Sequence, residues 1–377
     1  MTCPYAEICG GCLSRHLSEE QYRESKITAF CRTLSGIKAD FSFGAPIFIA
    51  DGTRRRASMA FRRRKGKITL GFNESASGNV VDCENCALLT PKLNAILPSI
   101  RHILTEVCSQ PFTIKKKGKK AMSVFLEGGD VWLCEADNGI DVVLEFDFSL
   151  ELSHRMIIFE LSQQSDAVIR ISHRRRPDAE AEPIVEKTSP YIKIADTTVY
   201  IPAGTFLQPS REGEQALVSL VLKYLGETSG RIADLFCGVG TFSYPLARNL
   251  SNRVLAVDSS ERLLDGFRHT VNKNMISNIE IVAKNLFKYP LDVSELKGIK
   301  AVVFDPPRAG AAAQTSQLAA VPIADRPERI IAVSCNPRTF VNDANTLISA
   351  GYKLTEVTMV DQFIYSNHSE LVALFTK

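Results

Sequence analysis

The sequence lacks any uncharged apolar run approaching the ~18 residues that a membrane-spanning helix requires. Its N-terminus also lacks the apolar core of a signal peptide. These absences argue against a membrane protein and predict a cytoplasmic location with no membrane partner. The 377 residues are enough for two or three domains, and a composition of 45% hydrophobic and 23% charged residues is ordinary for a globular protein.

A strong net charge is absent too, since the formal charge at pH 7 is only +3. The distribution of the basic residues is more informative than this average. Basic clusters occur at residues 54–56, 62–67, 115–120 and 173–176, all in the N-terminal half. A single charge run is usually only a solvated face, but four of them in one half predict a surface that faces a polyanion.

The ten cysteines of a cytoplasmic chain indicate metal binding or catalysis rather than disulfides. Cys3, Cys9 and Cys12 open the chain, and a Cys-x2-Cys pair, Cys83 and Cys86, follows some seventy residues later. The two Cys-x2-Cys pairs could form a four-thiolate zinc site. Alternatively, the first three cysteines and a later one could hold an iron–sulfur cluster. Spacing alone does not decide between the two metals.

The stretch at residues 231–243 organises the C-terminal half. An apolar run at residues 232–236 predicts a buried parallel strand, Gly238 and Gly240 predict a tight turn, and residues 241–248 predict a helix. This order of elements builds a binding crevice at the carboxyl end of a sheet. The third glycine of a dinucleotide-binding fingerprint is missing, because Ser243 stands in its place.

Polar residues end the following predicted strands as well. The run at residues 253–258 ends in Asp258, the run at 301–305 ends in Asp305, and the run at 329–335 ends in Cys335. Helical patterns between these runs predict an α/β sheet whose strand ends carry the site. Asp258 follows the glycines at about the twenty-residue distance at which an acid binds a ribose hydroxyl. The rigid segment at residues 305–308, Asp-Pro-Pro-Arg, resembles the substrate-edge motif of S-adenosylmethionine-dependent methyltransferases and is not part of a dehydrogenase fingerprint.

Two further patterns carry reactive groups. Cys335 precedes a helix predicted at residues 338–350, and a helix N-terminus stabilises a thiolate, so the sequence predicts an activated nucleophile. His368 and Glu370 stand two residues apart at the start of a predicted strand. Since alternate residues of a strand point to the same side, they are candidates for an acid–base pair.

With these motifs assembled, the chain resembles the RNA 5-methyluridine (uracil-C5) methyltransferase family. It is most similar to the bacterial members that carry an iron–sulfur cluster and act on 23S rRNA. The resemblance implies an α/β fold with a C-terminal class I (Rossmann-like) methyltransferase domain, an N-terminal iron–sulfur region and an α+β central domain. The expected boundaries are residues 1–92 for the cluster and hairpin region, 93–188 for the RNA-binding domain, and 189–377 for the methyltransferase domain. The matching segments are residues 3–12, 54–86, 206–208, 234–240, 305–308, 334–337 and 368–370.

The resemblance also assigns roles to residues. Cys335 would attack uracil C6 and Glu370 would remove the C5 proton. S-adenosyl-L-methionine would be the methyl donor and RNA, most closely 23S rRNA, the partner, with no obligate protein partner. Asp258 stands where a glutamate is usual in the family. The residues implied to contact the cofactor are Gln208, Phe236, Gly238, Asp258 and Asp305, and those implied to hold a [4Fe–4S] cluster are Cys3, Cys9, Cys12 and Cys86, with Cys83 uninvolved.

Several alternatives remain open at this point. The substrate could be transfer RNA rather than ribosomal RNA. An N-methyltransferase would need no cysteine nucleophile, so activity retained without Cys335 would favour it. An NAD-dependent oxidoreductase could use the glycine turn, although the missing third glycine argues against it. A non-catalytic iron–sulfur RNA-binding module would bind RNA without methyl transfer.

Overall fold

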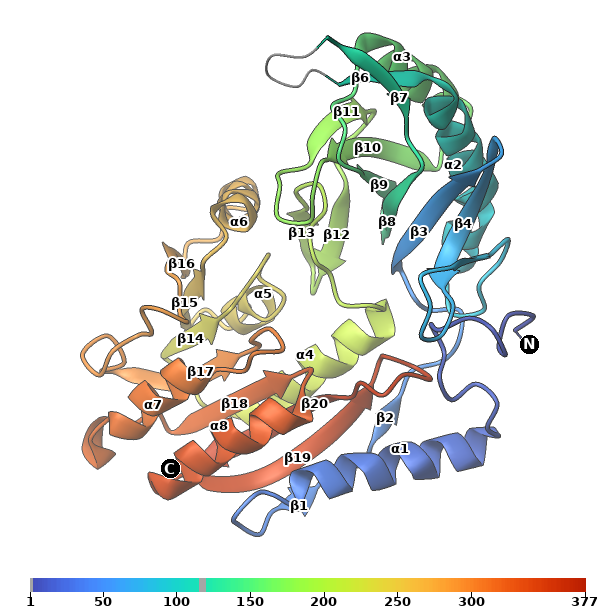
Figure 1. The fold of residues 1–377 in the computed structure, drawn as a ribbon. Helices are drawn as coiled ribbons and strands as arrows, with labels where there is room; N and C mark the ends of the chain where they lie inside the picture. Colours follow the sequence, from blue (N-terminus) through green and yellow to red (C-terminus); the bar gives the residue numbers. More distant parts are fainter. Residues whose placement is uncertain (1–2, 115–119) are drawn as a thin grey trace. The chain divides into compact units, whose positions relative to one another are not determined.

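The computed structural model describes residues 3–114 and 120–377, which form two compact units (Figure 1). Unit 1 comprises Met1–His16, Ala50–Ile192 and Ile201–Ser210, and unit 2 comprises Leu17–Ile49, Lys193–Tyr200 and Arg211–Lys377. The basic cluster expected at residues 115–120 lies, up to residue 119, outside the described residues. None of the helices in the described ranges is long and apolar enough to cross a membrane.

Unit 2 is built on a mixed sheet in which β20 alone runs antiparallel to its neighbours, among the strands that the structure describes. The strand order is β1-β19-β20-β18-β17-β14-β15-β16, and β2 also pairs with β19. The strands are β1 (Ser42–Phe43), β2 (Ile47–Phe48), β14 (Arg231–Leu235), β15 (Arg253–Asp258), β16 (Ile279–Ala283), β17 (Ile299–Phe304), β18 (Arg329–Ser334), β19 (Lys353–Asp361) and β20 (Glu370–Thr376).

Helices cover both faces of this sheet, which explains why its central strands are apolar on both sides. On β17, Val302 and Phe304 pack into the core beneath α1 (Glu19–Leu34), α7 (Ala312–Ala320) and α8 (Pro337–Ser349). The alternate residues Ala301 and Val303 pack into the core beneath α4 (Arg211–Leu225) and α5 (Ser243–Ala247). The sheet therefore lies between two helical layers. The predicted α/β class and the predicted strands at 232–236, 253–258, 301–305 and 329–335 are confirmed.

The order in which the chain adds strands to the sheet reverses at β14. The next strand along the chain, β15, pairs with one side of β14, and β17 pairs with the other side. In open α/β sheets, ligands bind at the carboxyl ends of the strands at such a switch point. Helix α6 (Glu261–Lys273) follows β15.

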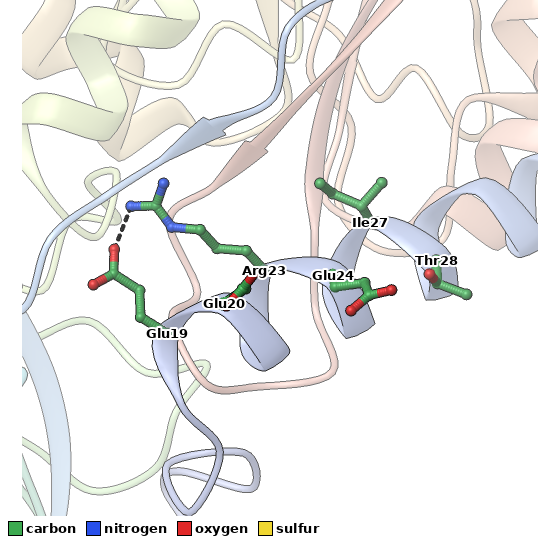
Figure 2. A pocket seen from close by; sticks show the side chains of 6 residues that line it. All are labelled: Glu19, Glu20, Arg23, Glu24, Ile27 and Thr28. Atoms are coloured by element: carbon green, nitrogen blue, oxygen red, sulfur yellow. Dashed lines mark ion pairs between the residues drawn. The ribbon is translucent and has the colours of Figure 1, made fainter.

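The segment at residues 17–49 joins unit 2, although the sequence grouped it with the cysteine region. Ser18 caps the N-terminus of α1 and forms a capping box with Gln21, and the helix buries Phe30 and Leu34 in the core of the sheet. Strands β1 and β2 then extend the sheet beside β19. The opposite face of α1 is exposed, and Figure 2 shows its side chains, including the ion pair of Glu19 with Arg23 at 2.6 Å. The division into three domains at residues 92 and 188 stays a prediction.

Unit 1 is an α+β structure with a second sheet, in the order β11-β10-β9-β8-β3-β4-β5. Helix α2 (Pro91–Ser109) packs on β4 and β8, and α3 (Leu152–Ser162) packs on β10, β11 and α2. Strands β3 and β4 form an antiparallel hairpin within residues 1–92, where a hairpin was expected. The strands are β3 (Arg56–Arg64), β4 (Lys67–Asn73), β5 (Val80–Asp82), β8 (Gly128–Ala136), β9 (Gly139–Glu145), β10 (Val168–Arg174) and β11 (Glu182–Glu186). Strand β6 (Pro111–Ile114) pairs with β7 (Met122–Phe125) apart from this sheet. A further pair, β12 (Tyr191–Ile194) with β13 (Thr197–Tyr200), begins in unit 1 and ends in unit 2.

Two of the predicted basic clusters are partly buried. Arg55 is 1% exposed and donates from Nε to the Gln208 carbonyl at 3.0 Å. Arg174 is buried and pairs with Glu145 at 2.6 Å. These two guanidinium groups satisfy internal acceptors and do not face solvent. Arg175 and Arg176 are exposed, so the polyanion-facing surface stays a prediction. The cluster at residues 62–67 differs, because its residues 64–67 are exposed at the β3–β4 turn.

Candidate active site

Strand register brings three of the predicted cofactor residues to one edge of the unit 2 sheet. Leu235, at the end of β14, pairs with a residue of β15 on one side and a residue of β17 on the other. Phe236, Asp258 and Asp305 each stand one residue beyond these pairs. All three therefore lie at the carboxyl ends of adjacent parallel strands, at the switch point of the sheet.

The predicted nucleophile and base meet across the antiparallel pair β18–β20. Ser334 pairs with Leu371, so Cys335, which follows Ser334, and Glu370, which precedes Leu371, come next to each other at the same sheet edge. The strand ends that carry Asp305 and Cys335 are also neighbours, because β17 pairs with β18. The electrostatic influence of Asp305 on both Cys335 and Glu370 is consistent with this proximity.

The glycine turn after β14 has the backbone conformation that its sequence predicts. Gly240 has a φ of 95°, and a Cβ there would come within 2.7 Å of the Phe267 ring, so only glycine fits. Asp258 fixes this turn: its two carboxylate oxygens accept the N–H of Gly238 at 3.0 Å and the N–H of Ser260 at 2.9 Å. Each oxygen keeps a further lone pair for a ligand hydroxyl.

Ser243, which replaces the third glycine, has a structural partner that the sequence did not reveal. Its hydroxyl donates to the Asp234 carboxylate at 2.5 Å, and both side chains are fully buried. Burial, together with the nearby charges of Asp305 and Asp258, raises the pKa of Asp234 to about 7. The serine therefore stabilises an acid buried beneath the turn, a role that a glycine could not perform.

Glu370 occupies an environment that suits a base operating near neutral pH. Its side chain is 2% exposed, Oε2 accepts a hydrogen bond from Gln362 at 2.9 Å, and Oε1 has no partner among the described residues. Burial, followed by the charge of Asp305, raises the pKa of Glu370 to about 8. A carboxyl with such a pKa and an unpaired oxygen can accept a proton.

Cys335 differs from its prediction as an activated thiolate. Burial, followed by the charges of Glu370 and Asp305, raises the pKa of its thiol to about 12, and Arg308 opposes this only in part. Helix α8 begins two residues later, after the N-cap Asn336, so burial and the two neighbouring acids outweigh the helix dipole. Burial and the two acids thus oppose the activation expected from the helix N-terminus, and the role of Cys335 as the nucleophile stays a prediction.

Asn336 joins the two loops that carry Asp305 and Cys335. Its Nδ2 donates to the carbonyl of Arg308 at 2.9 Å, while its Oδ1 accepts the N–H of Arg338 and caps α8. A single side chain thus holds the Asp-Pro-Pro-Arg loop against the Ser-Cys-Asn-Pro loop. This contact explains why an asparagine follows the thiol.

Comparison with known proteins agrees with this geometry. Residues 186–377 match the family described as tRNA (uracil-5-)-methyltransferase. An uncharacterized RNA methyltransferase of Brucella melitensis is 35% identical over 379 residues, covering 100% of this chain and 84% of that protein. The chain belongs to the tRNA (uracil-5-)-methyltransferase family. It is accordingly an S-adenosylmethionine-dependent RNA (uracil-C5)-methyltransferase.

The chain is also similar to two proteins whose substrates are named. A 23S rRNA (uracil(1939)-C(5))-methyltransferase of Pectobacterium atrosepticum is 29% identical over 384 residues, covering 99% of this chain and 79% of that protein. The crystal structure of the Pyrococcus abyssi tRNA (uracil-54, C5)-methyltransferase in complex with S-adenosyl-L-homocysteine superimposes with a TM-score of 0.71 at 22% identity, over 98% of this chain and 86% of that one. The structural likeness confirms the Rossmann-like methyltransferase fold.

The pKa values of Cys335 and Glu370 lead to a prediction about pH. Both groups act deprotonated in the roles predicted for them, and both pKa values are raised. The methylation rate should therefore climb through about pH 8, where Glu370 loses its proton, and go on climbing above about pH 9 as the Cys335 thiol does. Alkylation of Cys335 by iodoacetamide, followed by mass spectrometry, measures the thiol directly. Asp305→Asn removes one charge that raises both pKa values, so alkylation of this variant should begin at lower pH. Alkylation of the wild-type thiol with a midpoint near the ordinary cysteine pKa of about 8.5 would contradict this.

His368 does not pair with Glu370. The strand β20 begins only at Glu370, so the alternation that would place both side chains on one side does not reach His368. His368 is exposed, whereas Glu370 is buried. The acid–base pair inferred from the sequence is therefore wrong, and Gln362 is the hydrogen-bond partner of the carboxyl instead.

Gln208 belongs to unit 1, and the other predicted cofactor residues belong to unit 2. Gln208 is 6% exposed, and its carbonyl accepts the hydrogen bond from Arg55. Its contact with the cofactor stays a prediction.

The cysteines of the two N-terminal groups line one cavity of about 40 Å³ in unit 1, formed in part by Cys3, Cys9, Cys12, Cys83 and Cys86. The side chains of Cys9 and Cys83 hydrogen-bond to each other, and the N–H of Gly11 donates to the Cys9 sulfur at 3.4 Å. Within residues 3–114 and 120–377, no three His, Cys, Asp or Glu side chains are arranged to hold a metal ion. Cysteine thiols that gather around one cavity suit a metal ligated by thiolates. Their distances from one another, however, are not those of a metal-ligand set.

Proposed function

We propose that the chain methylates C5 of a uridine in 23S rRNA, with Cys335 as the nucleophile and Glu370 as the base. The adjacency of these two residues across β18 and β20, beside Asp305, is the observation that carries the proposal. The choice of 23S rRNA is supported by the relatives that bear this name at 29% identity.

The residues account for each stage of the reaction. Uracil C5 is a poor nucleophile. After the Cys335 thiol has lost its proton, the thiolate adds to C6, and the electron pair of the C5–C6 double bond makes C5 nucleophilic. When bound, S-adenosylmethionine supplies an electrophilic methyl group. C5 then carries both its proton and the methyl group, and Glu370 takes the proton. The bond between C6 and sulfur breaks, its electron pair returns to Cys335, and the proton remains on Glu370.

The cofactor would bind at the switch point of the unit 2 sheet, at Phe236, Gly238, Asp258 and Asp305, with Gln208 as a further contact. Support comes from the open lone pairs of Asp258 and from the half-buried ring of Phe236, whose centroid lies 5.4 Å from that of Phe287. An acid for the ribose and an apolar surface beside a glycine turn suit a nucleoside.

The cysteine cavity would hold a [4Fe–4S] cluster through Cys3, Cys9, Cys12 and Cys86. Support comes from the gathering of these thiols around one cavity, since clusters of this type are bound by four cysteine thiolates. The cluster would connect the first residues of the chain with the segment near residue 86. Zinc bound by the two Cys-x2-Cys pairs is the competing assignment.

Methyl transfer to defined RNAs tests the choice of substrate. Purified protein with methyl-labelled S-adenosylmethionine should label 23S rRNA and leave transfer RNA unlabelled. Digestion of the RNA and mass spectrometry should recover the label as 5-methyluridine, and the same nucleoside should be missing from 23S rRNA of a deletion strain. Labelling of transfer RNA alone would contradict the rRNA assignment. A label recovered only on an exocyclic nitrogen would contradict the whole proposal.

A further inference from the structure

A buried polar cluster in unit 2 lies behind the loop that leads to Glu370. It joins Tyr22 and Lys26, on the inner face of α1, to Asp361 at the end of β19. Lys26 is 7% exposed and Asp361 is completely buried. The outer face of the same helix, shown in Figure 2, carries ordinary exposed charges. None of the motifs in the sequence indicates this cluster.

Lys26 uses its ammonium group to hold the loop at residues 362–369. Its Nζ lies 3.0 Å from a carboxylate oxygen of Asp361 and donates to the carbonyls of Ser366 and His368, both at 2.7 Å. An ammonium group has three N–H donors, so these three oxygens match its full capacity. One side chain of α1 therefore fixes the beginning of this loop and two carbonyls close to its end.

Tyr22 holds the middle of the same loop. Its hydroxyl donates to the Asp361 carboxylate and accepts the N–H of Tyr365 at 2.9 Å. The two tyrosine rings also pack, with centroids 4.7 Å apart. Tyr365 has a φ of 58°, a strained backbone conformation for a residue other than glycine. Such strain persists only where surrounding contacts enforce it, and it is concentrated at functional sites.

The loop held by α1 carries the groups that define the position of the base. Gln362, directly after Asp361, donates to Oε2 of Glu370, and Glu370 itself follows the last residue of the loop. A displacement of the loop would move both the carboxyl and its hydrogen-bond donor. A buried ion pair contributes little to net stability because of its desolvation cost, so a geometric role explains this cluster better than a purely stabilising one.

We propose that Tyr22 and Lys26 are positioning residues, which hold the loop at residues 362–369 so that the Glu370 carboxyl meets the C5 proton of the methylated uracil. This inference rests on the proposed role of Glu370. Neither residue touches the substrate, and their effect should be confined to the step in which Glu370 acts.

The variants Tyr22→Phe and Lys26→Met test this inference, with Arg32→Met as a matched control on the exposed side of α1. In a single turnover with methyl-labelled S-adenosylmethionine, both variants should form the Cys335 adduct and transfer the methyl group at the wild-type rate. Product release should slow by about tenfold or more, because a misplaced base cannot take the proton. A methyl-labelled protein–RNA adduct that survives denaturing electrophoresis should accumulate. Arg32→Met should release product normally.

Two results would overturn the inference. One is normal product release in Tyr22→Phe, which keeps the ring and decides the question even if Lys26→Met does not fold. The other is an equal loss of methyl transfer and product release together with a lower melting temperature, which is the pattern of a purely structural pair. A parallel Glu370→Gln variant separates a failure of the proposed mechanism from a failure of this inference alone. If Glu370→Gln turns over normally, the proposed mechanism fails, and if it stalls while both α1 variants do not, only this inference fails.

Discussion

Cys335→Ala should lose methylation by about 10⁴-fold or more, because the covalent adduct that activates C5 can no longer form. Glu370→Gln should fail at a different stage. It should still attack C6 and transfer the methyl group, and then stall with the RNA attached to Cys335, since the amide cannot accept the C5 proton. Denaturing electrophoresis with label in the methyl donor distinguishes the two outcomes, and binding of S-adenosylmethionine should remain intact in both variants.

The second thiol near the site provides the control. Cys237 lies in the glycine turn, is 5% exposed, and burial raises its pKa well above the ordinary value. An RNA containing 5-fluorouridine should trap the wild-type enzyme, because fluorine cannot leave as a proton does, and peptide mapping should locate the adduct on Cys335. An adduct on Cys237, or normal turnover of Glu370→Gln, would refute the assignment of roles.

Cys86→Ala should lose the bound metal, whereas Cys83→Ala should retain it. If the ligands are Cys3, Cys9, Cys12 and Cys86, protein purified without oxygen should be brown and contain about four irons per chain. Removal of one ligand should abolish this content, as measured by metal analysis and visible absorbance. Stoichiometric zinc with negligible iron would refute the cluster.

Cys83 is a demanding control because it lines the same cavity. It is 1% exposed, and its side chain hydrogen-bonds with that of Cys9. It also packs against Gly71, where a Cβ would come within 3.0 Å of its sulfur. Loss of iron from Cys83→Ala would therefore show that the ligand set includes this buried thiol, and the assignment to Cys86 would fail.

The sequence by itself determined the elements whose signals are local. Apolar runs that end in Asp258, Asp305 and Cys335 predicted the strands and the residues at their ends, because an apolar strand followed by a polar residue is defined within a few positions. The turn at Gly238 and Gly240 was equally local, since the left-handed backbone conformation there requires glycine. Regular parallel topology then placed these residues at one sheet edge.

Only the tertiary structure decided which distant groups meet. The residues of α1 that hold the loop before Glu370 are more than 330 positions away in the chain, and no local pattern indicates a partner at such a separation. The sequence also did not show whether a charged side chain is exposed or buried. Arg55 belongs to a basic cluster that was expected at the surface, but it is buried and donates to the Gln208 carbonyl. The same holds for Cys335: its helix is visible in the sequence, but burial and the acids of neighbouring strands set its pKa. Hydrogen bonding, desolvation and charge depend on distances in space, which strand and helix patterns do not contain.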